Sequence, residues 1–63
     1  MPTQDQVVEA FKTLAGPVER PMAVKLRVRQ QTGCQDDEAD TALDAAVANG
    51  ALVVRPTGGL ALP

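Results

Sequence analysis

The side chains of this sequence that could do chemistry are mostly charged, and they form two clusters. The carboxylates between residues 35 and 49 are not interrupted by any lysine or arginine: Asp36, Asp37, Glu38, Asp40 and Asp44. The cations between residues 17 and 33 are accompanied by a single acid, Glu19: Arg20, Lys25, Arg27 and Arg29. Because the chain has no histidine, serine, tyrosine or tryptophan, Ser/His and Cys/His nucleophile pairs cannot be assembled. We therefore expect no enzyme activity and no catalytic residue.

The sequence predicts no metal site and no cofactor. One cysteine and no histidine leave neither a zinc motif nor an internal disulfide. The row of carboxylates could hold Mg²⁺ or Ca²⁺ weakly, but it lacks the glycine and the bidentate glutamate of a calcium loop. The T-G and T-G-G stretches are turn sequences that no phosphate-loop lysine follows. Acids rather than cations follow Cys34, so we expect this residue to be a buried small apolar side chain and not a reactive thiol.

The length and composition predict one domain, residues 1–63, of an ordinary soluble protein. A chain of this size buries only about 60% of the surface that its unfolded form exposes, so its stability is marginal. No apolar run approaches the ~18 residues that a membrane span needs. The N-terminus has no signal-peptide pattern, and a single cysteine suits a reducing compartment. We expect a cytoplasmic protein that makes no membrane contact.

The first half of the chain predicts two helices. Thr3 and Gln6 fit a capping box, and the apolar residues that follow share one helical face: Val7, Ala10, Phe11 and Leu14. Gly16 and Pro17 are expected to stop this helix, and Val18 to pair with a later strand. Residues 22–32 alternate like a strand, but their length and the Thr-Gly stop favour a helix. Either conformation is expected to expose Lys25, Arg27 and Arg29.

The second half predicts a turn, a helix and a hairpin. Gln35 or Asp36 caps the helix, whose buried stripe is Ala39, Leu43, Ala46 and Val47. Asn49-Gly50 is typical of a helix end, after which Leu52 is expected to return to the core. Residues 52–55 and 60–62 read as two strands joined by the turn sequence P-T-G-G.

This order of elements resembles the winged helix-turn-helix superfamily. The resemblance rests on the Gln31-Thr32-Gly33 turn, the helix exit through Asn49-Gly50 to Leu52, and the return of the hairpin at Gly58-Gly59-Leu60. It implies an α+β fold, a small winged helix with three helices followed by a C-terminal β-hairpin wing. In this superfamily the third helix usually lies in the DNA major groove, and other members are protein-interaction modules. The function must therefore be argued from the exposed faces.

We rank DNA binding first because it is the usual function of this superfamily. The third helix is acidic, however, and the phosphates on both sides of the major groove would repel it. We expect a small transcription regulator that contacts duplex DNA through the second helix and the wing. The candidate DNA contacts are Lys25, Arg27, Arg29, Gln30, Gln31, Arg55 and Thr57.

The charge distribution favours an alternative, a protein-interaction or adaptor module that uses the acidic face of the third helix. The candidate protein contacts are Asp36, Asp37, Asp40, Thr41 and Asp44. The expected partner is a protein of a regulator or polymerase complex, docked by its basic surface. A chain with one acidic and one basic face could also form a homo-oligomer head to tail.

Overall fold

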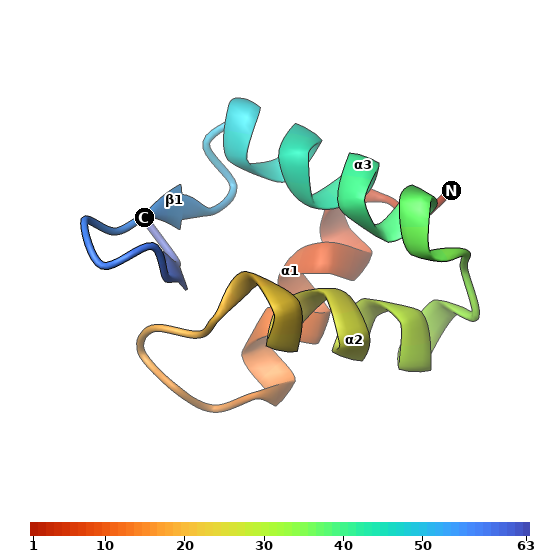
Figure 1. Ribbon diagram of the computed structural model, residues 1–63, viewed down its shortest axis with the longest axis horizontal. Helices are drawn as coiled ribbons and strands as arrows, with labels where there is room; N and C mark the ends of the chain where they lie inside the picture. Colours follow the sequence, from red (N-terminus) through yellow and green to blue (C-terminus); the bar gives the residue numbers. More distant parts are fainter.

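Three helices are followed by a hairpin in the computed structural model, which describes residues 1–63. The elements are α1 (Gln4–Thr13), α2 (Pro21–Thr32), α3 (Asp36–Ala48), β1 (Val53–Val54) and β2 (Leu60–Ala61). Figure 1 shows α2 and α3 facing each other with α1 behind them, and the hairpin beside the end where α2 begins and α3 finishes. The predicted α+β fold, with the layout of a small winged helix, is confirmed.

The capping residues predicted from the sequence are found at the N-termini of α1 and α3. At α1, the Thr3 hydroxyl accepts from the backbone N–H of Gln6 at 3.1 Å, and the Thr3 N–H donates to the Gln6 side chain at 2.9 Å. At α3, the cap is Gln35, whose N–H donates to Glu38 at 2.9 Å. These bonds satisfy backbone groups that have no partner inside the helix, and so they fix where each helix begins.

The end of α1 differs from the prediction. The helix finishes at Thr13, before the expected stop at Gly16 and Pro17, and Ala15 rather than a glycine takes a positive φ of 61°. A Cβ at Gly16 would collide only with the carboxylate of Glu19, which is the far end of a flexible side chain. The Glu19 side chain thus lies over Gly16 within the segment that joins α1 to α2, residues 14–20.

The hairpin is antiparallel, and its strands are shorter than predicted. Val53 pairs with Ala61 and Val54 with Leu60. The expectation that Val18 pairs with a later strand is wrong by one residue, since Glu19 forms the bridge to Leu60 through two backbone hydrogen bonds of 2.9 and 2.7 Å. Val18 instead lies against Gly59, where a Cβ would meet its side chain. The segment between α1 and α2 thus becomes the neighbour of β2, and β1 is the free edge.

The core lies between the three helices and the inner face of the hairpin. Its members are mostly small aliphatic residues around one aromatic ring: Val7, Ala10, Phe11, Val24, Val28, Ala39, Ala42, Leu43, Ala46, Leu52 and Leu60. On α2 the buried pair is Val24 and Val28, four residues apart as a helix requires, which leaves Met22 and Leu26 exposed. Cys34 and Val47 are only half-buried, although both were expected to be buried. None of the three helices has the length and apolar character that a membrane span requires.

Candidate functional site

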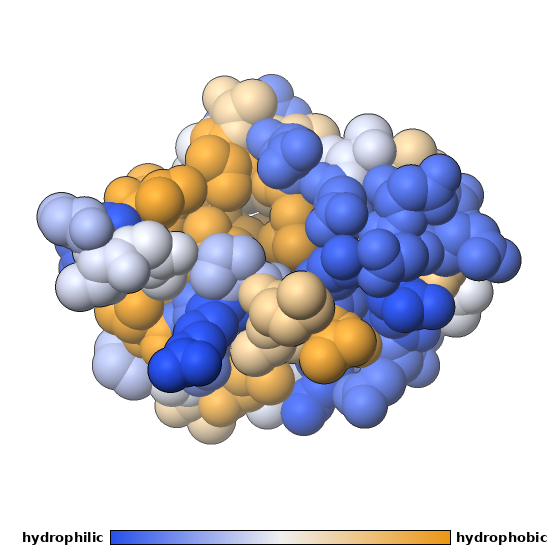
Figure 2. All heavy atoms as spheres, viewed as in Figure 1, coloured by the Kyte–Doolittle hydropathy of each residue, from blue (hydrophilic) through white to orange (hydrophobic).

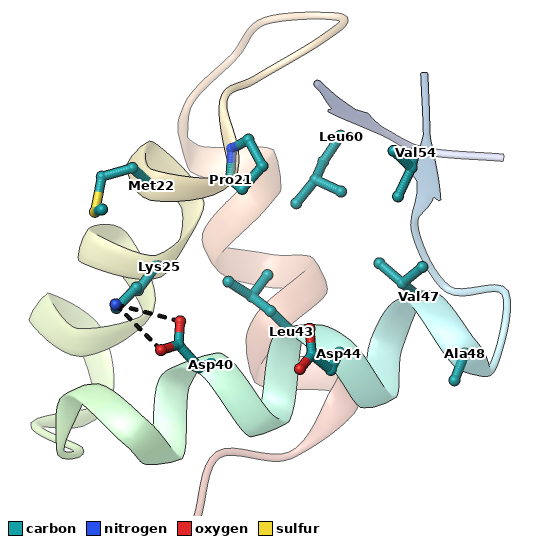
Figure 3. Close-up of a pocket in the computed structure, with 10 residues that line it drawn as sticks. All are labelled: Pro21, Met22, Lys25, Asp40, Leu43, Asp44, Val47, Ala48, Val54 and Leu60. Carbon is teal, nitrogen blue, oxygen red and sulfur yellow. Dashed lines mark hydrogen bonds and ion pairs between the residues drawn. The ribbon is translucent and has the colours of Figure 1, made fainter. Parts of the chain in front are cut away.

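The two charged clusters of the sequence meet where α2 ends and α3 begins. The Nζ of Lys25 lies 2.8 Å from an Asp36 carboxylate oxygen and 3.2 Å from an Asp40 oxygen. The guanidinium of Arg29 lies 3.4 Å from Asp36. The Lys25 side chain is only 12% exposed, whereas its two carboxylate partners face solvent. The dashed lines in Figure 3 mark the contacts between Lys25 and Asp40.

This cluster corrects the expectation that the cations of α2 form an exposed basic face. A turn of three residues, 33–35, joins the helices and brings the charges of one beside those of the other. The hydrogen bond to Asp36 raises the pKa of Lys25, and the same bond lowers the pKa of Asp36, because each charge stabilises the other. Lys25 is therefore already occupied within the chain, and Arg29 is partly so.

A second group of predicted DNA contacts, Arg27, Gln30 and Gln31, lies beside the C-terminal end of α1. The guanidinium of Arg27 donates to the Thr13 hydroxyl at 2.8 Å and to the Thr13 carbonyl at 3.5 Å, and its Nε donates to Gln30 at 3.1 Å. Gln31 also donates to the Thr13 hydroxyl, at 3.5 Å. A cation at a helix C-terminus complements the negative end of the helix dipole, so Arg27 has a structural role here.

The remaining predicted DNA contacts, Arg55 and Thr57, are exposed on the hairpin. The hairpin lies at the opposite end of the α2–α3 pair from the turn beside Arg29 (Figure 1). The predicted DNA contacts are therefore spread over three places: the α3 side of α2, the α1 side of α2, and the wing.

The predicted protein contacts do share one face. All are exposed along α3: Asp36, Asp37, Asp40, Thr41 and Asp44. Asp37 and Asp44 form no ion pair, and the Thr41 hydroxyl donates to the Asp37 carbonyl at 2.9 Å. The outer face of α3 therefore keeps negative charge that nothing in the chain neutralises.

Glu38 is the acid of α3 that serves the fold. It accepts from the backbone N–H of Gln35 and lies 3.5 Å from the N-terminal amine of Met1. The backbone hydrogen bond, followed by the charge of the amine, lowers the pKa of this carboxyl. Glu38 thus ties the start of α3 to the start of the chain.

Sequence reasoning missed an apolar groove beside the acidic face. It has a volume of about 430 Å³ and lies between the start of α2, the outer side of α3 and the hairpin. Figure 3 shows its lining residues, which are Pro21, Met22, Lys25, Asp40, Leu43, Asp44, Val47, Ala48, Val54 and Leu60. In Figure 2 apolar residues surround a hollow on the hairpin side, and hydrophilic residues cover the other side. One signal of this groove is present in the sequence, the adjacent valines at 53 and 54. Successive side chains of a strand point to opposite faces, so one valine of the pair should lie on the outer face of the hairpin.

The acids do not gather into a metal centre, since no group of three or more His, Cys, Asp or Glu side chains is placed to hold an ion. Comparison with protein-family models, curated proteins and solved structures finds no match to this chain. The function must therefore be argued from the α3 face and the groove.

Proposed function

We propose that this chain is a protein-interaction module with a winged-helix layout, and that its contact surface is the acidic outer face of α3. Its partner would be a protein with a basic surface, for which the module acts as an adaptor in a regulator or polymerase complex. The observation that carries the proposal is which charged side chains are paired within the chain and which are not. The α2 cations Lys25 and Arg29 are engaged by acids of α3, while Asp37 and Asp44 form no ion pair.

Electrostatics supports this choice over docking of α3 in a DNA groove. Neutralising phosphates supplies most of the non-specific affinity for DNA, and major-groove contacts to bases come mainly from Arg, Lys, Asn and Gln. The exposed positions of α3 present carboxylates instead. The same carboxylates would attract a basic protein surface and steer its approach.

Duplex DNA binding through α2 and the wing is the second candidate. The observation that favours it is that Arg27 and Arg55 form no ion pair. Arg27 would have to contact phosphate while it holds Thr13, and Lys25 would have to leave Asp36 and Asp40 to contribute.

Capture of proteins from an extract of the native host tests the first candidate. The wild type is compared with an Asp37→Lys, Asp44→Lys variant and with a control of equal charge change on α1, Asp5→Lys with Glu9→Lys. The control also reverses one first-turn acid, as the test variant does. We expect basic proteins that the wild type and the control retain and the α3 variant loses. Equal capture by all three would contradict the proposal.

Fluorescence anisotropy with a labelled DNA duplex tests the second candidate in parallel. At about 50 mM salt, we expect no more binding by the wild type than by an Arg27→Ala, Arg55→Ala variant. Binding by the wild type that falls steeply with salt, and that the double substitution weakens, would favour DNA over a protein partner.

A further inference from the structure

The groove joins an uncovered apolar surface to the carboxylates of α3. Met22 and Val54 stand on opposite walls and are each 58% exposed, while Leu43 and Leu60 are buried at its base. Asp40 and Asp44 lie along the α3 rim, four residues apart and therefore on one helical face. Figure 3 shows these acids bordering the same space that the apolar side chains enclose.

The two rim acids differ in how far they are neutralised. Asp40 is paired with Lys25, whose Nζ lies within 3.3 Å of both carboxylate oxygens of Asp40. Asp44 has no hydrogen bond or ion pair from its side chain. A ligand seated in the groove would therefore meet one free carboxylate at the rim, one turn along α3 from an acid that is already paired.

We infer that the groove binds a short segment of a partner protein that places an aliphatic or aromatic side chain among Met22, Val47 and Val54 and a lysine or arginine against Asp44. This inference rests on the proposed function and specifies the chemistry of the partner. The groove volume falls within the ~300–1,000 Å³ of ordinary ligand sites, which suits one large anchoring side chain. Segments that dock in hydrophobic grooves insert apolar anchor side chains, and the rims of protein interfaces are polar.

Charge disfavours a second copy of this chain as the occupant. A two-fold contact through the groove would use the same patch on both copies. The Asp44 of each copy would then meet an acidic rim, because no cation in the groove other than the occupied Lys25 could receive it. A basic segment of another protein meets no such repulsion.

Selection of short random peptides displayed against the immobilised wild type tests the inference without assuming a partner. We expect enriched peptides to combine an aliphatic or aromatic residue with a lysine or arginine nearby. One enriched peptide is then synthesised with a fluorophore, and its Kd is measured by anisotropy. Failure to enrich any peptide, or enrichment of peptides without a basic residue, would overturn the inference.

Substitutions then locate the peptide. The double variant Met22→Ser, Val54→Ser should weaken binding by about tenfold or more, because it removes apolar walls that the ligand would cover. Leu26→Ser is the matched control, since Leu26 is 49% exposed on α2 outside the groove, and it should leave Kd unchanged. Asp44→Lys should weaken binding about fivefold or more and reduce its salt dependence. Because Met22, Leu26 and Val54 are all exposed, these variants should remain folded, which their NMR spectra will show.

The variants also separate failure of this inference from failure of the proposed function. If the peptides respond to Asp44→Lys but not to Met22→Ser, Val54→Ser, the acidic face binds partners and the groove does not. If they respond to neither change, both the groove and the rim acid are excluded as the site. Sedimentation of the wild type alone tests whether a second copy of the chain fills the groove. Self-association that Val54→Ser abolishes would mean that the occupant is a second copy and not a segment of another protein.

Discussion

The two ends of the α2–α3 pair differ in whether their side chains find partners within the chain. At the end with the connecting turn, Lys25 and Arg29 contact Asp36, and the charges of the two helices satisfy one another. At the hairpin end, Met22 and Val54 are exposed and Asp44 has no partner. The first end is closed by interactions within the chain, and the second is left open.

This contrast shows that the formal charge of a helix does not describe the surface it offers. By sequence α2 is the basic helix, yet its most central cation, Lys25, is 12% exposed and held by two carboxylates. By sequence α3 carries five acids and no cation, but only its outer face keeps free charge. The surface available to a partner is therefore set by which charges the fold has already paired.

The base of the groove should respond most strongly to substitution. Leu43 forms part of the core as well as the groove, so Leu43→Ala should reduce the free energy of unfolding by about 2–5 kcal/mol. For a chain this small, that is a large share of the total stability. Urea denaturation followed by circular dichroism measures the loss. Leu26→Ala on the exposed side of α2 is the control, and an equal loss there would contradict the assignment of Leu43 to the core.

Acid should weaken the closed end. The folded-state pKa values of Asp36 and Glu38 lie below their ordinary values, so the stabilisation from these groups is complete above the unfolded pKa and is lost as the pH falls through the folded one. We therefore expect the denaturation midpoint to fall as the pH drops below about 4. Asp36→Asn should flatten part of this dependence. An unchanged pH profile in that variant would show that the ion pair does not form in solution.

Replacing the central cation should have a smaller effect than either change above. In Lys25→Met the Asp36 carboxyl loses the hydrogen bond that is the main cause of its lowered pKa, so that pKa should rise towards its ordinary value. Carbon-detected NMR titration measures it directly. The stability loss should stay below that of Leu43→Ala, since both freed carboxylates remain in water. Lys12→Met, at an exposed and unpaired position of α1, should leave Asp36 unchanged.

The open end should tolerate change best. Val54 is 58% exposed, so Val54→Ser should alter the free energy of unfolding by no more than about 0.5 kcal/mol. Thermal denaturation of the variant beside the wild type measures the difference. A loss as large as that from Leu43→Ala would mean that the Val54 side chain belongs to the core, and the groove would then be closed in solution.

Local signals predicted most of the fold. The Thr3 and Gln6 capping box, the stop at Gly33 and the return of Leu52 to the core each depend on neighbouring residues, and each is found. The end of α1 was misplaced because the prediction relied on Gly16 and Pro17, whereas the helix finishes at Thr13 and Ala15 takes the positive φ. The strand bridge falls at Glu19 rather than Val18, which depends on how this segment packs beside β2.

The candidate site was less predictable for the same reason. The exposure of Asp37 and Asp44 follows from helical periodicity, and the acidic face was predicted from it. The pairing of Lys25 with Asp36 and Asp40 joins residues 11 and 15 positions apart and depends on how two helices pack. The groove requires three elements to come together, and no local pattern encodes that arrangement.

The most direct test of the central claim is a backbone-amide NMR titration of the labelled wild type with an enriched basic–apolar peptide. We predict that chemical-shift changes cluster at Met22, Asp44 and Val54 and leave Gln31 and Gly33 unmoved. Changes centred instead on Arg27 and Gln31, or spread evenly over the chain, would contradict the claim that the acidic face of α3 and its adjoining groove form the interaction surface.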